Sequence, residues 1–254
     1  IAQWFQGLQD DICGQLEAAD GGGKFLEDRW QRPGGGGGRS RVIAGKHIEE
    51  GGVNFSAVHG ELSEQASKNL GIKPGNFFAT GVSIVLHPGN PHVPIIHMNV
   101  RYFELDAETW WFGGGIDLTP HYIDVEDARF FHQQLKDVCD KHHADYYPEF
   151  KTWADDYFYI RHRKETRGVG GIFFDRLSGD EGFTRAQRFA YVRDVGNAFC
   201  PIYLHLLAKS KDKPFSEREK NWQMLRRGRY VEFNLVWDAG TKFGLHTDGR
   251  TESI

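Results

Sequence analysis

The segment that decides the fold reads PIIHMNVRYFE over residues 94–104. Side chains of a β-strand point alternately to the two faces of its sheet. One face of this strand is apolar and carries Ile96, Met98, Val100 and Tyr102. The other face carries His97, Asn99 and Arg101, about 7 Å apart along one line. The pattern predicts a strand with one face packed against helices and one polar face.

Two further segments have the same period of two. In 81–87 the apolar face alternates with Ser83, Val85 and His87, and in 229–237 it alternates with Tyr230, Glu232, Asn234 and Val236. An antiparallel sheet commonly has one solvated face, which is one interpretation of these strands. The alternative is a concave polar floor beneath a ligand, because the polar residues are of the Ser, His, Asn, Arg and Glu types, with hardly any Lys or Thr.

Glycine and aromatic residues are the unusual part of the composition. Glycine accounts for 31 of 254 residues, about 12% where about 7% is usual, and aromatic residues make up 14%. Residues 110–120 read WWFGGGIDLTP, in which three glycines interrupt an aromatic strand. Such glycines mark either a strand kink or the close approach of another body, and a flat aromatic ligand would fit there. Asp117 follows them, either as a turn-capping carboxylate or as a group beside that ligand.

The remaining segments predict an α+β fold in a single domain over residues 1–254. Helical spacing covers 3–19, 124–143 and 184–208, and Ser216 with Glu219 forms a capping box that opens a short helix. Residues 40–58 predict a hairpin, and 229–237 a last strand. Strands and helices each come in runs, which favours antiparallel pairing over a βαβ repeat. The run Gly34–Gly38 is either a flexible loop or backbone close to a ligand.

Charge and hydropathy exclude several classes of protein. The net charge of -4 argues against a nucleic-acid binder, which would be strongly basic. No apolar run reaches the 18 residues that a transmembrane helix requires, which leaves peripheral membrane association open. Three scattered cysteines indicate a reducing compartment. The chain begins at Ile1 without a methionine, so we expect it to be part of a longer chain.

Four histidines are the candidate metal ligands, namely His87, His97, His132 and His162. None of them has the HxxH or HExxH spacing that makes a metal site specific. His132 borders the apolar stripe of the 124–143 helix, where a hydrogen-bonded core histidine is the common case. His162 has cationic neighbours and fits a surface position. We therefore do not expect a metal to be essential.

Long motifs of this chain resemble those of the oxygen-dependent coproporphyrinogen III oxidases. They lie at 81–88, 90–94, 97–104, 110–120, 155–159, 168–175 and 228–236, and the 32–38 run fits as well. The resemblance extends in order along nearly the whole chain. It implies a large antiparallel sheet flanked by helices on both sides, assembled as a homodimer with much of the contact from about Tyr230 onward. The family continues beyond Ile254.

The resemblance also implies an activity. Enzymes of this family decarboxylate two propionates of coproporphyrinogen III oxidatively to vinyl groups, giving protoporphyrinogen IX in heme biosynthesis. Dioxygen is the oxidant, carbon dioxide and hydrogen peroxide leave, and no organic cofactor is expected. Versions of the core occur in the cytoplasm, in the mitochondrial intermembrane space and in plastids. We expect the cytoplasm here, with the other two compartments as alternatives.

Site residues follow from the resemblance one by one. It places Ser83, Asn99, Val100, Arg101, Asp248, Gly249 and Arg250 at the substrate, and His87, His97, His132 and His162 at a divalent metal. His97 matches the proton donor, and Arg101 would clamp a propionate. We add Asp117 as a candidate for holding or deprotonating a pyrrole N–H.

One departure from the family concerns the loop 247–250, where Asp248 replaces the usual second glycine. An acid there would either face the anionic substrate unfavourably or point away from it. Two rival functions remain: a tetrapyrrole carrier without chemistry, and a metal-dependent oxygenase built on the four histidines.

Overall fold

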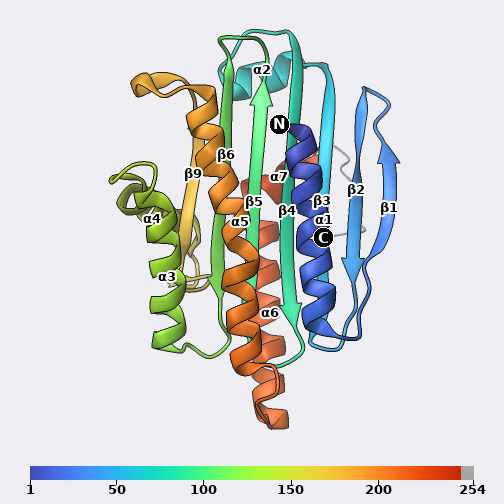
Figure 1. Cartoon of the computed structure of the whole chain (residues 1–254), viewed down its shortest axis with the longest axis vertical. Helices are drawn as coiled ribbons and strands as arrows, with labels where there is room; N and C mark the ends of the chain where they lie inside the picture. The colour runs from blue at the N-terminus through green and yellow to red at the C-terminus, as the bar shows by residue number, and fades with distance from the viewer. Residues whose placement is uncertain (247–254) are drawn as a thin grey trace.

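The 94–104 segment forms strand β5 (Ile95–Glu104) of a seven-stranded antiparallel sheet in the computed structural model, which describes residues 1–246 (Figure 1). The spatial order is β1-β2-β3-β4-β5-β6-β9. The other six strands are β1 (Leu26–Gln31), β2 (Gly36–Ile43), β3 (Ile48–Glu61), β4 (Asn76–Pro88), β6 (Trp110–Thr119) and β9 (Gly171–Leu177). The short strands β7 (Tyr159–Ile160) and β8 (Glu165–Thr166) form a separate hairpin.

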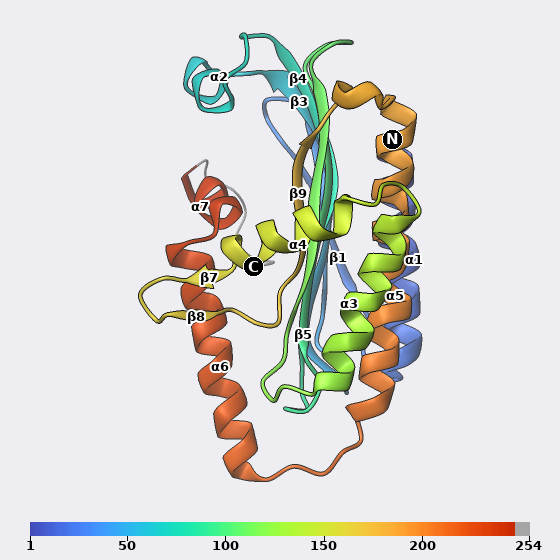
Figure 2. The same cartoon turned by 90° about the vertical axis from the view of Figure 1, so that its left-hand side faces the viewer.

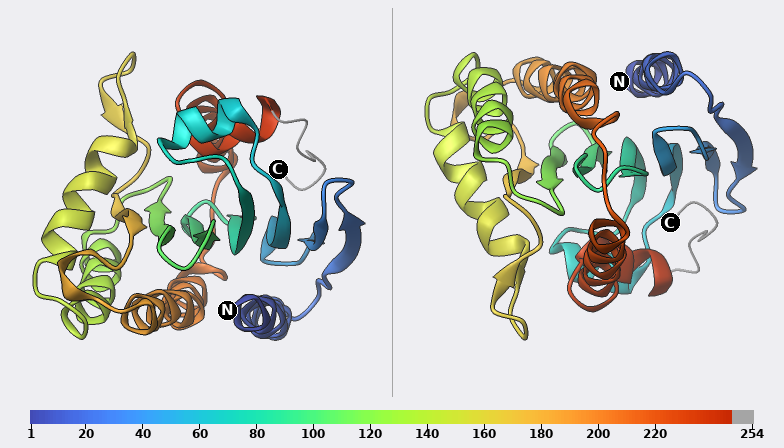
Figure 3. Two further views of the ribbon diagram at one scale, coloured as in Figure 1. Left: turned by 90° about the horizontal axis from the view of Figure 1, so that it is seen from above. Right: turned by 90° about the horizontal axis from the view of Figure 1, so that it is seen from below.

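Helices cover both faces of the sheet, as the resemblance implied (Figure 2). They are α1 (Ala2–Asp20), α2 (Glu64–Leu70), α3 (Val125–Asp140), α4 (Tyr146–Tyr157), α5 (Arg185–Ser210), α6 (Glu217–Val236) and α7 (Ala239–His246), with a 3-10 turn at Asp180–Gly182. Helices α1, α3 and α5 lie on one side, while α2, α6, α7 and the β7–β8 hairpin lie on the other (Figures 2 and 3). We call these sides the α5 face and the α6 face of the sheet.

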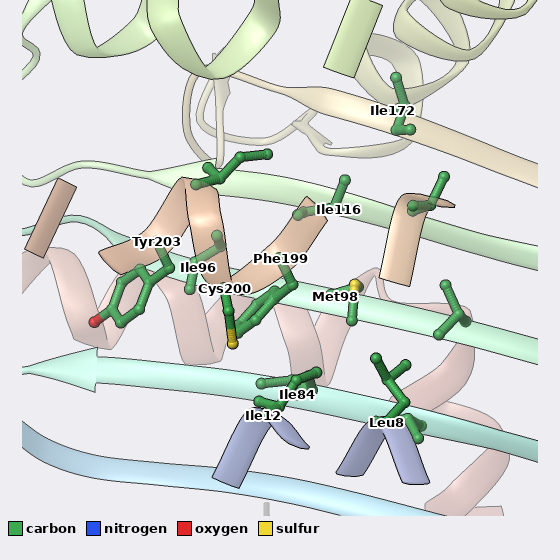
Figure 4. Close-up of a cluster of buried hydrophobic side chains, with 14 of the residues drawn as sticks. Leu8, Ile12, Ile84, Ile96, Met98, Ile116, Ile172, Phe199, Cys200 and Tyr203 are labelled. Atoms are coloured by element: carbon green, nitrogen blue, oxygen red, sulfur yellow. The ribbon is translucent and has the colours of Figure 1, made fainter. Parts of the chain in front are cut away.

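The main core fills the space between the sheet and the α5-face helices (Figure 4). Ile96, Met98 and Val100 of β5 are fully buried there, against Phe199 and Tyr203 of α5. Each such side chain contributes about 1.5–3 kcal/mol when removed from water. The apolar alternation of β5 therefore fixes which face of the sheet is left for polar residues.

Asp20 ties the end of α1 to the β2–β3 turn. Its carboxylate accepts hydrogen bonds from the backbone N–H groups of Gly23, Lys46, His47 and Ile48, at 2.7–2.8 Å. Burial alone would raise the pKa of Asp20, but these four donors outweigh it and lower the pKa to about 2. The predicted 40–58 hairpin is confirmed, with this carboxylate as the anchor of its turn.

Residues 229–237 are the main error of the sequence prediction, because they continue α6 and do not form a strand. The capping box at Ser216 and Glu219 is confirmed, but it opens a helix of 20 residues where a short one was predicted. The buried positions are Gln223, Tyr230 and Phe233, which follow the helical repeat and not a period of two. The alternating apolar residues from Val231 onward therefore matched the spacing of a strand by coincidence. The residues that are buried in the fold are a different set.

The Gly34–Gly38 run is not a free loop, because Gly36, Gly37 and Gly38 pair in β2 with β3, and Gly37 and Gly38 pair with β1 as well. Gly36 has φ 79°, and a Cβ at this position would lie 2.2 Å from the carbonyl oxygen of Ala57. Only glycine fits a backbone that turns into the sheet this closely. The described residues contain no helix long and apolar enough to cross a membrane.

Candidate active site

The polar face of β5 lies on the α6 face of the sheet. Residues paired directly across antiparallel strands share a face, so the register identifies the neighbours of each polar side chain. His97 stands between Val85 and Asp117, Asn99 between Ser83 and Gly115, and Arg101 between Gly81 and Gly113. The predicted pairing of the 81–87 and 94–104 strands is thus confirmed.

A floor of small residues extends from these positions across the sheet. The register places two rows side by side, Gly113-Arg101-Gly81-Ser56-Gly38 and Gly115-Asn99-Ser83-Asn54-Ser40. Arg101 is the one long side chain in these two rows. Glycines in a strand usually mark the close approach of another body, and here they recur on three alternate strands, β2, β4 and β6. The predicted polar floor therefore exists, although β4 and β5 build it together with β2, β3 and β6 and not with residues 229–237.

His97 is oriented by a buried carboxylate on the neighbouring strand. Its Nδ1 lies 2.8 Å from Oδ1 of Asp117, and Asp117 is 2% exposed. An ionised carboxylate can only accept hydrogen bonds, so Nδ1 of His97 carries the proton and donates it. In the neutral ring Nε2 is then the nitrogen that can accept a proton, and in the charged ring it can deliver one.

Arg167 neutralises Asp117 from the α6 face of the sheet. Its Nη2 lies 2.7 Å from both carboxylate oxygens, and its Nη1 donates to Oδ1 of Asn234 at 2.9 Å. Burial alone would raise the pKa of Asp117, but the charge of Arg167 and the bond from His97 hold that pKa below its ordinary value. Asp117 is therefore an ionised group whose oxygens are already engaged, and it lies beneath His97.

Three aromatic rings enclose the Arg167 guanidinium. Its central carbon lies 4.2 Å from the ring centroid of Phe158, 4.5 Å from that of Tyr230 and 4.8 Å from that of Phe233. Rings facing a desolvated guanidinium attract it through their electron-rich faces. Tyr230 and Phe233 belong to α6, so this helix supports the His97–Asp117 pair from the α6 face.

Arg101 is held in place by two side chains on the same face. Its Nη1 donates to Oδ1 of Asn99 at 2.8 Å, and its Nη2 to Oδ1 of Asp175 at 3.0 Å. A Cβ on Gly113 would lie 2.3 Å from Oδ1 of Asp175 and 2.8 Å from Nε of Arg101. The glycine at 113 thus leaves the room in which Asp175 and Arg101 meet.

The four candidate metal ligands are not brought together. His87 packs edge-on against Tyr230, and burial lowers its pKa to about 4. His132 lies on α3, where Nε2 bonds the carbonyl oxygen of Val169 at 2.8 Å and Nδ1 lies 3.0 Å from the hydroxyl of Tyr147. Both of its ring nitrogens are therefore engaged within the chain.

The other two histidines are also engaged. His162 lies between β7 and β8 and pairs with Glu232 of α6, while His97 is committed to Asp117. Within residues 1–246 no three His, Cys, Asp or Glu side chains gather as metal ligands would. The residues present do not fit a metal centre made of these histidines.

The other residues predicted to contact the substrate do not all lie on the floor. Ser83 is half-buried on the floor, whereas the side chain of Val100 is fully buried on the α5 face, so only its backbone could face a ligand. Asp248, Gly249 and Arg250 lie outside the described residues.

Sequence reasoning missed three residues of the candidate site, Arg167, Asp175 and Asp238. Asp238 follows α6 and accepts hydrogen bonds from the hydroxyl of Tyr157 at 2.7 Å and from the backbone N–H of Thr241 at 2.6 Å. Burial alone would raise the pKa of Asp238, but these two bonds, with a smaller contribution from the charge of His97, lower it. Of these three residues, only Arg167 could have been anticipated from the sequence, because a buried carboxylate such as Asp117 requires a cation as its partner.

Comparison with known proteins agrees with the motifs. The family model described as Coproporphyrinogen III oxidase matches residues 1–254. The chain is 48% identical to a protein of Prochlorococcus marinus named oxygen-dependent coproporphyrinogen-III oxidase, over 100% of this chain and 81% of that protein. It is 52% and 50% identical to chloroplastic proteins of that name from Glycine max and Nicotiana tabacum, over 97% of this chain and 67% and 66% of theirs.

Proposed function

Because the chain belongs to the coproporphyrinogen III oxidase family, we propose that it decarboxylates two propionate side chains of coproporphyrinogen III oxidatively, giving protoporphyrinogen IX. Each step is R–CH2–CH2–COO⁻ + O2 + H⁺ → R–CH=CH2 + CO2 + H2O2. The bond to the carboxylate breaks, and its electron pair forms the vinyl double bond. The carbon next to the pyrrole gives up one hydrogen with two electrons, and these reduce dioxygen to peroxide.

The observation that carries the proposal is the Arg167–Asp117–His97 array beside Arg101 on a floor of small residues. The tetrapyrrole macrocycle can lie on this floor because glycine and serine keep it low. Arg101 offers charge-assisted hydrogen bonds to a propionate, in a direction fixed by Asn99 and Asp175. His97 stands on the same face, four residues from Arg101 and about 13 Å from it along the strand.

His97 is the proton-transferring group in this proposal, and Asp117 is its positioning residue. Our prediction that Asp117 itself holds or deprotonates a pyrrole N–H receives less support from the geometry. Both of its oxygens bond to Arg167, and the residue is buried below His97. A carboxylate in this position fixes the ring tautomer of His97 and stabilises its charged form.

Dioxygen is the only oxidant in the proposed reaction, in accord with the word oxygen-dependent in the names of the relatives. We propose no organic cofactor and derive no step through a metal, since the four histidines are spread over both faces of the sheet and the β7–β8 hairpin. The protein contributes orientation of the substrate and exclusion of water from the reacting carbon.

A homodimer is part of the proposal, and a second apolar stripe on α6 supports it. Met224, Val231 and Leu235 lie on one side of the helix and are 49%, 49% and 54% exposed. Their spacing of seven and four residues is typical of a helix that packs on a partner helix. Leu235→Glu should convert a dimer to a monomer in sedimentation equilibrium, with Leu26→Glu as the control, since Leu26 is more exposed and lies on strand β1.

The compartment stays a prediction. Two of the relatives carry the word chloroplastic in their names, which supports the plastid alternative and not the expected cytoplasm. Peripheral membrane association likewise remains open.

The decisive experiment measures dioxygen consumption with coproporphyrinogen III on protein that has been stripped of metal. We expect turnover, with two carbon dioxide and two hydrogen peroxide molecules per protoporphyrinogen. Absence of turnover that added divalent metal restores would favour the metal-dependent oxygenase. Tight porphyrin binding without dioxygen uptake, and unchanged by Asp117→Ala, would favour the tetrapyrrole carrier.

A further inference from the structure

Three aromatic rings form a row on the α6 face, next to the small-residue floor. The row consists of Phe77, Phe103 and Trp111. Phe103 stacks on Trp111 with centroids 4.2 Å apart and on Phe77 with centroids 6.0 Å apart. Phe103 pairs with Trp111 across β5 and β6, two positions beyond Arg101 and Gly113, so the row shares their face. None of the three rings belongs to the two buried clusters of the core.

Each end of the aromatic row carries an exposed arginine. The guanidinium of Arg176 lies 4.9 Å from the ring centroid of Trp111, and that of Arg32 lies 5.7 Å from the ring of Phe77. Arg176 donates to the backbone oxygen of Leu70 at 2.6 Å and Arg32 to that of His59 at 3.1 Å. Neither arginine pairs with a carboxylate within residues 1–246. Each guanidinium has five N–H donors, so both retain donors for an anion.

The backbone is strained in order to place Arg176 there. Arg176 has φ 53°, and it shares positive φ with only one other non-glycine residue of the described chain, Lys164. The register of β6 and β9 shifts at this point, so that Asp175 and Arg176 together oppose Gly113. Consecutive strand residues normally point to opposite faces, whereas a bulge with a left-handed residue re-aims one of them.

The consequence of this bulge is that two consecutive side chains serve the same face. Asp175 reaches Arg101 at 3.0 Å, and Arg176 reaches the ring of Trp111. A left-handed conformation is unfavourable for a non-glycine residue. Such strain commonly persists where it serves a site.

We propose that the aromatic row and its two arginines form a second anchoring site for the tetrapyrrole, which rests on the function proposed above. The three aromatic side chains contact the far edge of the macrocycle. Arg176 and Arg32 bind the carboxylates on the two pyrroles whose propionates do not react. Phe103 and His97 are six residues apart, about 20 Å along β5. A tetracarboxylate whose reacting propionate lies at Arg101 and His97 directs its other carboxylates away from them, toward this end of the face.

The anchoring site makes the enzyme selective for porphyrinogens with carboxylates on the non-reacting rings. Arg176→Gln and Arg32→Gln should each raise the KM for coproporphyrinogen III about tenfold and leave kcat unchanged, the result expected when binding energy is lost equally from ground state and transition state. With a dicarboxylate porphyrinogen that carries ethyl groups on the non-reacting rings, wild type and variants should share one KM. The control is Arg193→Gln, whose guanidinium lies 5.9 Å from the ring of Phe189 on the α5-face helix.

Two variants separate binding from folding. Arg176→Gly removes the guanidinium and relieves the strained φ, so KM should rise while the melting temperature stays equal or increases. The proposal is overturned if Arg176→Gln and Arg176→Gly keep a KM within twofold of the Arg193→Gln control, or if the two substrates show the same rise in KM.

The test also distinguishes this site from the proposed function. If wild type consumes no dioxygen, the proposed function fails. The anchoring site is then tested by equilibrium binding of the oxidised tetracarboxylate and dicarboxylate porphyrins. Tryptophan fluorescence is the readout of binding. Weaker binding of the tetracarboxylate alone by Arg176→Gln supports it, and equal binding by variant and control refutes it.

Discussion

Replacing Arg167 by methionine tests the buried array on which the proposed chemistry depends. Asp117 is 2% exposed and both of its oxygens bond to Arg167, so the variant leaves a buried carboxylate with His97 as its remaining side-chain partner. Removing one member of a buried ion pair costs about 3–5 kcal/mol. Methionine retains most of the packing against the three rings, so this cost comes mainly from the uncompensated charge. We expect the free energy of unfolding in urea at pH 7 to fall by that amount.

The pH dependence follows from the direction of the pKa shift. The folded pKa of Asp117 lies below its ordinary value of 3.8, so the ion pair stabilises wild type fully above pH 3.8, and this stabilisation is lost as the pH falls through the folded pKa. In Arg167→Met, burial without the cation raises the pKa of Asp117, so protonation removes the penalty. The difference between wild type and variant should therefore shrink on acidification.

Activity provides the second readout. Without Arg167 the carboxylate no longer fixes His97, and proton transfer by a positioned group typically contributes a factor of about 10²–10⁴. We expect kcat to fall by about 10² with little change in KM, and Arg167→Lys to recover part of kcat. The control is Arg163→Met in the β7–β8 hairpin, which loses an exposed pair with Glu232 and should leave the free energy of unfolding close to that of wild type.

A double variant makes the reasoning refutable. Arg167→Met combined with Asp117→Asn removes both charges, so its destabilisation should be well below the sum of the two single variants. Additive losses, or a stability of Arg167→Met within 1 kcal/mol of wild type, would show that the pair is not the strongly coupled unit described above.

Three further predictions concern other parts of the molecule. Arg101→Gln should raise the KM for coproporphyrinogen roughly 10- to 100-fold in steady-state dioxygen uptake, since it loses a charge-assisted bond to a propionate, and an unchanged KM would exclude that contact. Asp20→Asn should cost about 2 kcal/mol at pH 7, because the folded pKa of about 2 lies below the ordinary aspartate value of 3.8. The stabilisation is complete above pH 3.8 and lost as the pH falls through 2, so equal urea midpoints of variant and wild type at pH 7 would contradict it. His132→Gln should lower the free energy of unfolding by about 1–3 kcal/mol and leave KM unchanged, whereas loss of a bound metal measured by atomic emission would contradict its structural role.

Local pattern was sufficient for most of the fold. The alternation around His97 predicted which face of β5 is buried, and helical spacing predicted α1, α3 and α5 within a few residues. These features depend on side chains close in sequence, whose periodicity is dictated by backbone geometry. The prediction failed at 229–237, where β-branched and aromatic residues fit both periods and only packing against Phe158 and Arg167 selects the helix.

The sequence by itself determined the antiparallel sheet, the polar face with His97, Asn99 and Arg101, and the family to which the motifs belong. Only the tertiary structure decided the partners of those residues. Arg167 is 50 residues from Asp117, and Asp175 is 74 residues from Arg101. Pairing across such separations follows from strand register, from the bulge at Asp175–Arg176 and from the docking of α6. These are set by the burial of charge and apolar surface in the whole molecule, and no local period in the sequence encodes them.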